Sequence, residues 1–182
     1  MFWGGTIDSV SVMRLSHQTK HRASQAKTSS VKDDRIVVRP FRMEDYGAAF
    51  ALWRRCEGVG LGSSDTREAI AAYLRRNPGL SFVAQMKGRL VGAVLCGHDG
   101  RRGYLHHLAV SKRCRRAGLG RRLVDLCLER LRRIDIHKCN IFVFSDNLDG
   151  MTFWTRTGWT PRPDLSLLQV NLSSACSRKR SC

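Results

Sequence analysis

The feature that most constrains this chain is a basic turn with two glycines, Arg115-Arg116-Ala117-Gly118-Leu119-Gly120. It follows an apolar run over 105–110 and opens an amphipathic helix pattern over 119–131. The first amides of a helix have no intrahelical acceptor, and the helix dipole adds partial positive charge, so an anion is stabilised at that end. Glycines let an anion approach the backbone closely, and arginines supply the opposing charge. The turn therefore predicts a phosphate-binding site.

Sequence motifs narrow the kind of phosphate site. A P-loop needs a Gly-Lys-Ser or Gly-Lys-Thr ending, which this chain lacks. A dinucleotide fingerprint needs a third small residue three positions after the second glycine, where Leu123 stands. Taken alone, the turn is also compatible with an ordinary connection between a strand and a helix.

The wider segment narrows the choice further. Residues 104–120 read Tyr-Leu-His-His-Leu-Ala-Val-Ser-Lys-Arg-Cys-Arg-Arg-Ala-Gly-Leu-Gly. This resembles the acyl-coenzyme A binding motif of the GCN5-related N-acetyltransferases (GNAT family), in which a strand ending in Leu-Ala-Val precedes Arg/Gln-x-x-Gly-x-Gly/Ala. Arg115, Gly118 and Gly120 stand at the matching positions.

A second motif of the same family follows at the expected distance. A strand pattern over 141–144 precedes Asn147 and then Phe153-Trp154-Thr-Arg-Thr-Gly158-Trp159, with Trp154 where the family usually has tyrosine. The resemblance covers about residues 35–172. Within the family it is most similar to the small, single-domain bacterial type with an Asp-Gly-x-Arg-Gly turn, here at 99–103.

The resemblance implies a cofactor site for acetyl-coenzyme A, used as a co-substrate, between two strands that splay apart. Backbone groups at 108–110 would bind the pantetheine arm, and the amides of the basic turn would bind the diphosphate. The residues it assigns to the cofactor are Leu108, Ala109, Val110, Arg115, Arg116, Ala117, Gly118, Leu119, Gly120, Arg121, Asn147, Phe153 and Trp154. It also places acceptor recognition in the loop over 58–64 and near 164–168.

The catalytic acid and base do not follow the family pattern. An indole cannot protonate a leaving thiolate, so Trp154 either packs in the core or hydrogen bonds. Water or another side chain must then serve as the acid, and Tyr104 is the candidate side chain. The usual glutamate base is absent, which leaves His106 and His107. Strand alternation predicts Tyr104, His106, Leu108 and Val110 on one face and Leu105, His107 and Ala109 on the other, so only one histidine can face the substrate. We select His106.

The acceptor class follows in part from acid–base chemistry. A lysine amine with a pKa of about 10.4 is rarely neutral at pH 7, whereas an α-amine near 7.8 often is, so a weak base suits amines of low pKa. We therefore expect N-acetyl transfer to a small-molecule amine or to a peptide or protein α-amine. Glu57, Asp65 and Asp99 are further candidates for recognising a cationic amine, although each residue type also caps helices and forms turns. The alternative is an acyl-coenzyme A-binding protein with impaired catalysis.

The predicted domain is an α/β fold of the GNAT-like kind: a mixed, mostly antiparallel central sheet with helices on both faces and a splayed strand pair. Strands are expected over 35–41, 80–86, 90–96, 104–110, 139–144 and 165–172. Helices are expected over 45–55, 65–75, 119–131 and 148–156, with Gly158 ending the last one. Residues 1–34 read as a disordered or targeting-like extension, residues 35–172 as the acetyltransferase domain, and residues 173–182 as a disordered basic tail.

Charge and cysteine content limit the partners. The net charge is +17, and residues 101–133 carry eleven Lys or Arg against two acids, which the coenzyme phosphates explain in part. We do not expect nucleic acid as a partner, because aromatic residues are not interleaved with these arginines. The seven cysteines show no metal-ligand spacing and are odd in number, so we expect a reduced, cytoplasmic compartment and no metal. No apolar run is long enough to span a membrane. Oligomeric state is left open, with a homodimer among the options.

Overall fold

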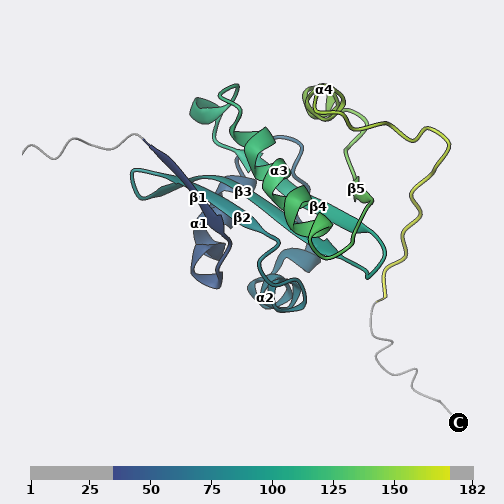
Figure 1. Ribbon diagram of the computed structural model, residues 1–182, viewed down its shortest axis with the longest axis horizontal. Coiled ribbons are helices and arrows are strands. Elements are labelled where there is room, and N and C mark those ends of the chain that lie inside the picture. The colour runs from purple at the N-terminus through teal and green to yellow at the C-terminus, as the bar shows by residue number, and fades with distance from the viewer. Residues whose placement is uncertain (1–34, 173–182) are drawn as a thin grey trace, which may run out of the picture. The chain divides into compact units, whose positions relative to one another are not determined.

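The computed structural model describes residues 35–172, drawn in colour in Figure 1. The expectations for residues 1–34 and 173–182 lie outside the described residues. The described elements follow the predicted order from the first strand to the helix over 148–156, and only the predicted final strand is missing from it. No described helix is both long and apolar enough to cross a membrane.

Five strands form one sheet in sequential order: β1 (Ile36–Pro40), β2 (Phe82–Met86), β3 (Arg89–His98), β4 (Gly103–Val110) and β5 (Cys139–Ile141). Neighbouring strands run antiparallel except β4 and β5, which are parallel. The β2–β3 hairpin turns at Lys87 and Gly88, whose φ values of 52° and 71° suit a tight hairpin turn. The predicted mixed, mostly antiparallel sheet is confirmed.

Helices cover both faces of this sheet, as predicted. Figure 1 shows α1 (Tyr46–Trp53) and α2 (Arg67–Arg76) on one side and α3 (Leu119–Arg132) on the other. The last helix, α4 (Leu148–Arg156), follows β5. Three short 3-10 helices, η1 (Met43–Asp45), η2 (Ser63–Asp65) and η3 (Lys112–Cys114), lie in the connections of the described chain. Thr66 caps α2 by accepting a hydrogen bond from the Ala69 amide, one residue later than the capping pattern suggests.

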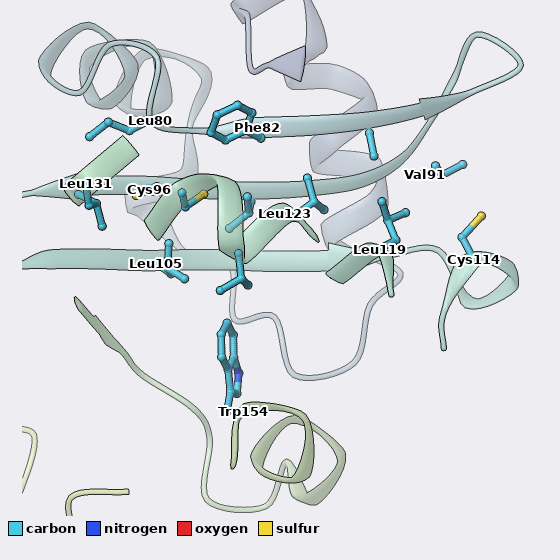
Figure 2. Close-up of a cluster of buried hydrophobic side chains, with 14 of the residues drawn as sticks. Leu80, Phe82, Val91, Cys96, Leu105, Cys114, Leu119, Leu123, Leu131 and Trp154 are labelled. Atoms are coloured by element: carbon cyan, nitrogen blue, oxygen red, sulfur yellow. The ribbon is translucent and has the colours of Figure 1, made fainter. Parts of the chain in front are cut away.

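Each face of the sheet has its own buried cluster. On the α3 side, apolar side chains of α3 pack on β2, β3 and β4, and Trp154 reaches this cluster from α4 (Figure 2). On the other side, α1 and α2 bury Ala49, Trp53 and Ile70 against Val83 and Ala93. Two independent cores thus hold the sheet rigid between them, and β4 contributes to both.

Strands β4 and β5 separate shortly after they meet. Their pairing extends only from Gly103–Cys139 to Leu105–Ile141. β5 ends at Ile141 rather than at 144, and the chain over 142–147 leaves the sheet. The later half of β4 therefore has no strand beside its outer edge in the described chain, which is the splay that the resemblance implies.

A bulge in β4 overturns the expected alternation of its side chains. The β3–β4 register passes from Ala93–Ala109 to Leu95–His106, so His107 and Leu108 together face a single residue of β3. His107 has a φ of +51°. Because the extra residue reverses the facing, Leu105 is buried in the α3-side cluster whereas Ala109 is buried in the opposite cluster. The prediction that these residues share one face was wrong.

The predicted last strand over 165–172 was also wrong. This segment has no regular secondary structure, and the side chains of Leu168 and Leu172 are both 91% exposed. Its alternating apolar pattern is typical of a strand, but a strand forms only when a neighbouring strand accepts its hydrogen bonds, and in residues 35–172 β5 has β4 alone beside it.

Candidate active site

The N-terminus of α3 presents a run of backbone amides without acceptors. Gly118 is the N-cap residue with φ +76°, and Arg116 also has a positive φ of 62°. Among the described residues, the amides over 116–121 find no hydrogen-bond acceptor; the first amide that does is that of Arg122, which donates to the Gly118 carbonyl. The phosphate-binding turn predicted from the sequence is therefore open at the end of a fourteen-residue helix.

Three predicted cofactor residues from three elements meet beside this turn. A Cβ atom at Gly120 would lie 3.4 Å from the Phe153 ring of α4 and 3.8 Å from Val110 Cγ2 of β4. These are ordinary van der Waals distances, so Phe153 and Val110 line the side of Gly120 directly. The splayed end of β4, the start of α3 and the helix α4 therefore meet at one location beside the amide run.

The arginines in and beside the turn make different contacts. Arg115 Nε donates to the Val110 carbonyl at 3.1 Å, which fastens the turn to the end of β4. Arg121 lies 3.7 Å from Asp125 on the exposed helix surface. Arg116 is exposed and carries its charge close to the amide run. Charge and amides together can neutralise a diphosphate.

Asn147 and Trp154 have structural duties in addition to their predicted cofactor roles. Asn147 Oδ1 accepts the Gly150 amide at 2.8 Å and so caps α4, which leaves its Nδ2 as the group available to a ligand. Trp154 is 7% exposed and packs edge-on against Phe153 and Trp159, with ring centroids 4.9 Å apart in each case. The structure thus places Trp154 in the core, directly beside Phe153, which lines the junction with Val110 and Gly120.

The loop between α1 and α2 closes against the segment that follows β5. A Cβ atom at Gly58 would fall 2.0 Å from Asn147 Nδ2, and one at Gly60 would fall 2.7 Å from the Phe144 ring. The exposed ion pair between Lys112 and Glu57, at 2.9 Å, ties the start of this loop to η3. The loop that the resemblance assigns to acceptor recognition therefore borders the splay.

His106 is a half-buried imidazole enclosed by aromatic rings. Its ring centroid lies 6.0 Å from that of Tyr73 and 6.4 Å from that of Tyr104. Burial, helped by the neighbouring His107, lowers its pKa below the usual range. No described residue forms a hydrogen bond with its ring. His106 is therefore a neutral imidazole at pH 7, but nothing in the described chain orients it.

Tyr104, the other predicted catalytic residue, donates a hydrogen bond from its hydroxyl group to Asp99 Oδ2 at 3.2 Å. The amides of Arg101 and Arg102 also donate to Asp99 and, with Tyr104, lower the pKa of that carboxyl to about 2. Asp99 thus forms the β3–β4 turn. Glu57 is held by Lys112, so neither of these two acids stands alone as a receptor for a cationic amine.

Sequence reasoning missed a close pair between β4 and η2. His107 Nε2 lies 2.6 Å from Asp65 Oδ1, and the two side chains are 16% and 11% exposed. Asp65 Oδ2 accepts the Gly62 amide at 2.7 Å, so one carboxylate fastens both the loop and the strand. Uniform alternation assigns His107 to the opposite face, and no local signal announces the bulge that turns it toward α1.

Within residues 35–172, no group of His, Cys, Asp and Glu side chains could hold a metal ion. The five described cysteines are free thiols, and four of them are buried. The buried polar atoms left without a partner in this part of the chain are Trp53 Nε1 and the Tyr73 hydroxyl, both on the side of α1 and α2.

Known proteins resemble this chain in sequence and in fold. Residues 46–159 match the acetyltransferase (GNAT) family. An acetyltransferase of Pectobacterium atrosepticum is 32% identical over 112 residues, which are 62% of this chain and 79% of that protein. An acetyltransferase of Sodalis glossinidius is 31% identical over 137 residues, which are 75% and 96% of the two chains. The crystal structure of the PaiA N-acetyltransferase from Thermoplasma acidophilum, in complex with coenzyme A, superposes with a TM-score of 0.62 at 16% identity, over 69% of this chain and 90% of that one.

Proposed function

The chain belongs to the GNAT family of acetyltransferases, and from that premise we propose that it transfers an acetyl group from acetyl-coenzyme A directly to an amine. The observation that carries the proposal is the run of amides over 116–121, which have no acceptor among the described residues and lie at a helix N-terminus lined by arginines. The T. acidophilum protein of the same fold has coenzyme A bound, which supports acetyl-coenzyme A as the co-substrate here.

The residues present fit the cofactor at several points. The amides over 116–121, with Arg115, Arg116 and Arg121, would hold the diphosphate. The open edge of β4 over 108–110 would hydrogen bond the pantetheine arm, Asn147 Nδ2 would donate to it, and Phe153 would pack against it. The cofactor would supply an acetyl group activated as a thioester, and backbone amides near Leu108 are the candidates to stabilise negative charge on its carbonyl oxygen.

The acceptor is an amine that must lose a proton before it attacks. Because the described site offers imidazoles rather than a carboxylate-rich pocket, it suits an amine whose pKa is near neutrality, including a peptide α-amine. Tyr104 is the sequence-predicted acid for the departing thiol, and it can serve only if its hydroxyl leaves Asp99. His106 is the sequence-predicted base.

A second candidate function is acyl-coenzyme A binding with impaired catalysis. The observation that favours it is Trp154, which occupies the position of the family's usual tyrosine and is buried in the core. A chain without that acid could still bind the cofactor through the amide run, since none of those contacts involves Trp154.

Two measurements on the full chain test the proposal. Calorimetric titration with acetyl-coenzyme A should show micromolar binding that Gly120→Glu abolishes, because a carboxylate there would meet Phe153, Val110 and the phosphates. Gly47→Glu is the matched control, since nothing lies within 4 Å of a Cβ at that helix position. Thiol release with a panel of amines, including peptide N-termini, should then show turnover.

The outcomes separate the alternatives. Binding with turnover supports the transferase. Binding without turnover on any amine supports the impaired acyl-coenzyme A-binding protein. Absence of binding by a folded chain contradicts both.

A further inference from the structure

We propose that His107, oriented by Asp65, is the group that takes the proton from the acceptor amine, in place of His106. This proposal rests on the proposed acetyl transfer. It assigns His107 as the catalytic base and Asp65 as a positioning residue that acts through it.

The contact between the two side chains fixes which imidazole nitrogen is available. Asp65 Oδ1 lies 2.6 Å from His107 Nε2, so Nε2 carries a proton toward the carboxylate and Nδ1 is left with its lone pair. No described residue bonds Nδ1, and it is not among the described polar atoms sealed from solvent. An imidazole with one nitrogen held by a carboxylate and the other free is the arrangement that general bases use.

Asp65 is itself held in place by several contacts. Its second oxygen accepts the Gly62 amide at 2.7 Å, and its backbone carbonyl accepts the Tyr46 hydroxyl at 2.9 Å. The carboxylate is therefore committed to one position between the acceptor loop and β4. When His107 takes up a proton, this fixed negative charge stabilises the imidazolium without rearrangement.

The surroundings of His107 contain few other charges. From α1, the neutral Trp53 ring packs at 5.0 Å, and on the same strand His106 lies at 6.5 Å. From the η2 side, Asp65 is the one charged group in contact with it among the described residues. His106 lacks such a partner, and burial disfavours its charged form. Of two adjacent imidazoles, the structure thus gives one a carboxylate partner at hydrogen-bond distance and leaves the other without one among the described residues.

The position of His107 matches the task. It occupies the β4 bulge, directly before the open strand edge that the proposed function assigns to the pantetheine arm. A positive φ is uncommon for a residue with a side chain, and such conformations persist where the surroundings over-determine them, often at active sites. Here the Asp65 contact supplies that constraint.

Proton transfer to His107 comes before the attack on the thioester. The ammonium form of the acceptor gives one proton to His107 Nδ1. The free amine attacks the thioester carbonyl, the carbon–nitrogen bond forms and the carbon–sulfur bond breaks. The thiolate leaves with the electron pair and takes up the second amine proton to become the thiol, and solvent finally removes the first proton from the imidazolium.

Matched glutamine variants of the two histidines test this assignment. In His107→Gln, the side-chain amide can still donate to Asp65, so the loop contact is kept while the base is lost. We expect kcat to fall on the order of 100- to 1,000-fold and the acidic limb of the kcat/KM profile against pH to disappear, with unchanged acetyl-coenzyme A affinity. His106→Gln should lower kcat by less than about tenfold and retain the limb.

Two further variants keep the test decisive. Asp65→Asn removes the charge that stabilises the imidazolium, so the acidic limb should move to lower pH. His107→Gly suits the positive φ and leaves space in which added imidazole should restore turnover in proportion to its neutral form. A purely structural role for His107 predicts no rescue by imidazole.

The proposal is overturned if His107→Gln keeps its kcat and its acidic limb, or if His106→Gln alone loses them. A wild-type chain that binds acetyl-coenzyme A but acetylates no amine overturns the transferase function, and this inference with it. A transferase whose His107 variants behave like wild type overturns this inference alone.

Discussion

The two faces of the sheet bury different chemistry. All four buried polar or charged residues of the described chain lie in the segments next to α1 and α2, before, between or after these helices: Asp45, Asp65, Asn77 and Ser81. Each accepts a backbone amide: those of Arg42, Gly62, His98 and Cys96, respectively. On the α3 side, the buried cluster contains apolar side chains and thiols only. The α3 side is therefore an apolar scaffold, whereas the fixed polar contacts lie near α1 and α2.

This difference separates stability from chemistry. The thiols on the α3 side stay neutral at physiological pH, because burial raises the pKa of the Cys139 thiol to about 12, and a hydrogen bond with Cys96 together with burial raises the pKa of Cys127 still higher. The α1–α2 side holds the two histidines, Asp65 and the acceptor loop. We expect substitutions on the first face to change the free energy of unfolding, and those on the second to change turnover and its pH dependence.

The largest expected effect is on the free energy of unfolding, from a substitution on the α3 side of the sheet. Trp154→Ala removes a buried side chain that bridges α4 to the cluster below α3, and should lower the free energy of unfolding by about 3–5 kcal/mol in urea denaturation. Leu148→Ala, on the same helix but 73% exposed, is the control and should change it by less than about 0.5 kcal/mol. Equal losses from both variants would contradict the idea that α4 is anchored through Trp154.

A smaller effect is expected from the buried ion pair near α1. Asp45 accepts two hydrogen bonds from Arg39, at 2.6 and 2.7 Å, and one from the Arg42 amide. Burial pushes the pKa of Asp45 up, but these contacts outweigh burial and leave the pKa below its usual value. Asp45→Asn should therefore cost about 1–3 kcal/mol at pH 7.

The pH dependence of that pair has a definite sign. Because the folded-state pKa of Asp45 is depressed, its contribution is complete above the unfolded value of about 3.9 and is lost as the pH falls through the folded value. Thermal melting of the wild type should lose this contribution in acid, whereas Asp45→Asn should not. Asp164→Asn, which breaks a fully exposed pair with Arg162, is the control and should leave the melting curve at pH 7 unchanged. Identical acid sensitivity of Asp45→Asn and wild type would contradict the assignment.

Much of the scaffold could be predicted from the sequence because local rules determine it. Gly118 starts α3 where the motif places it, α4 spans Leu148–Arg156 as predicted, and Lys87 with Gly88 turns the hairpin. Each of these depends on residues within one turn of the chain, where propensity and capping decide the backbone. The family and the mixed sheet followed from the same motifs.

The rest of the site depends on contacts between distant segments. Asp65 and His107 are 42 positions apart, and they meet only because a bulge adds one residue to β4. Strict alternation of side chains along a strand does not allow for an extra residue, so it predicts the two histidines on opposite faces of the sheet. The strand predicted over 165–172 does not form for a related reason. An alternating pattern does not specify which strand would pair with it. The cofactor contacts at the amide run stay predictions.

A subtler effect is expected where the acceptor loop meets the segment after β5. Gly60→Ala places a Cβ 2.7 Å from the Phe144 ring, which is 55% exposed and can move aside. We expect the acceptor KM to rise about 3- to 10-fold, equivalent to about 0.7–1.4 kcal/mol, with unchanged acetyl-coenzyme A affinity. Gly62→Ala is the matched control in the same loop, because nothing lies within 4 Å of its Cβ. A change in cofactor affinity instead would place this loop on the cofactor side.

The smallest effect tests whether exposed polar contacts on the α1–α2 side matter at all. Lys112 and Glu57 lie 2.9 Å apart, but their side chains are 68% and 75% exposed, so water and salt screen the pair. Lys112 lowers the pKa of Glu57, yet both side chains remain exposed to water. Glu57→Gln should therefore leave the melting temperature and the acceptor KM unchanged at physiological salt. This pair joins the acceptor loop to η3, which precedes the amide run. A clear loss of turnover would therefore mean that the exposed Lys112–Glu57 pair, and not only the buried Asp65 contact, fixes the acceptor loop.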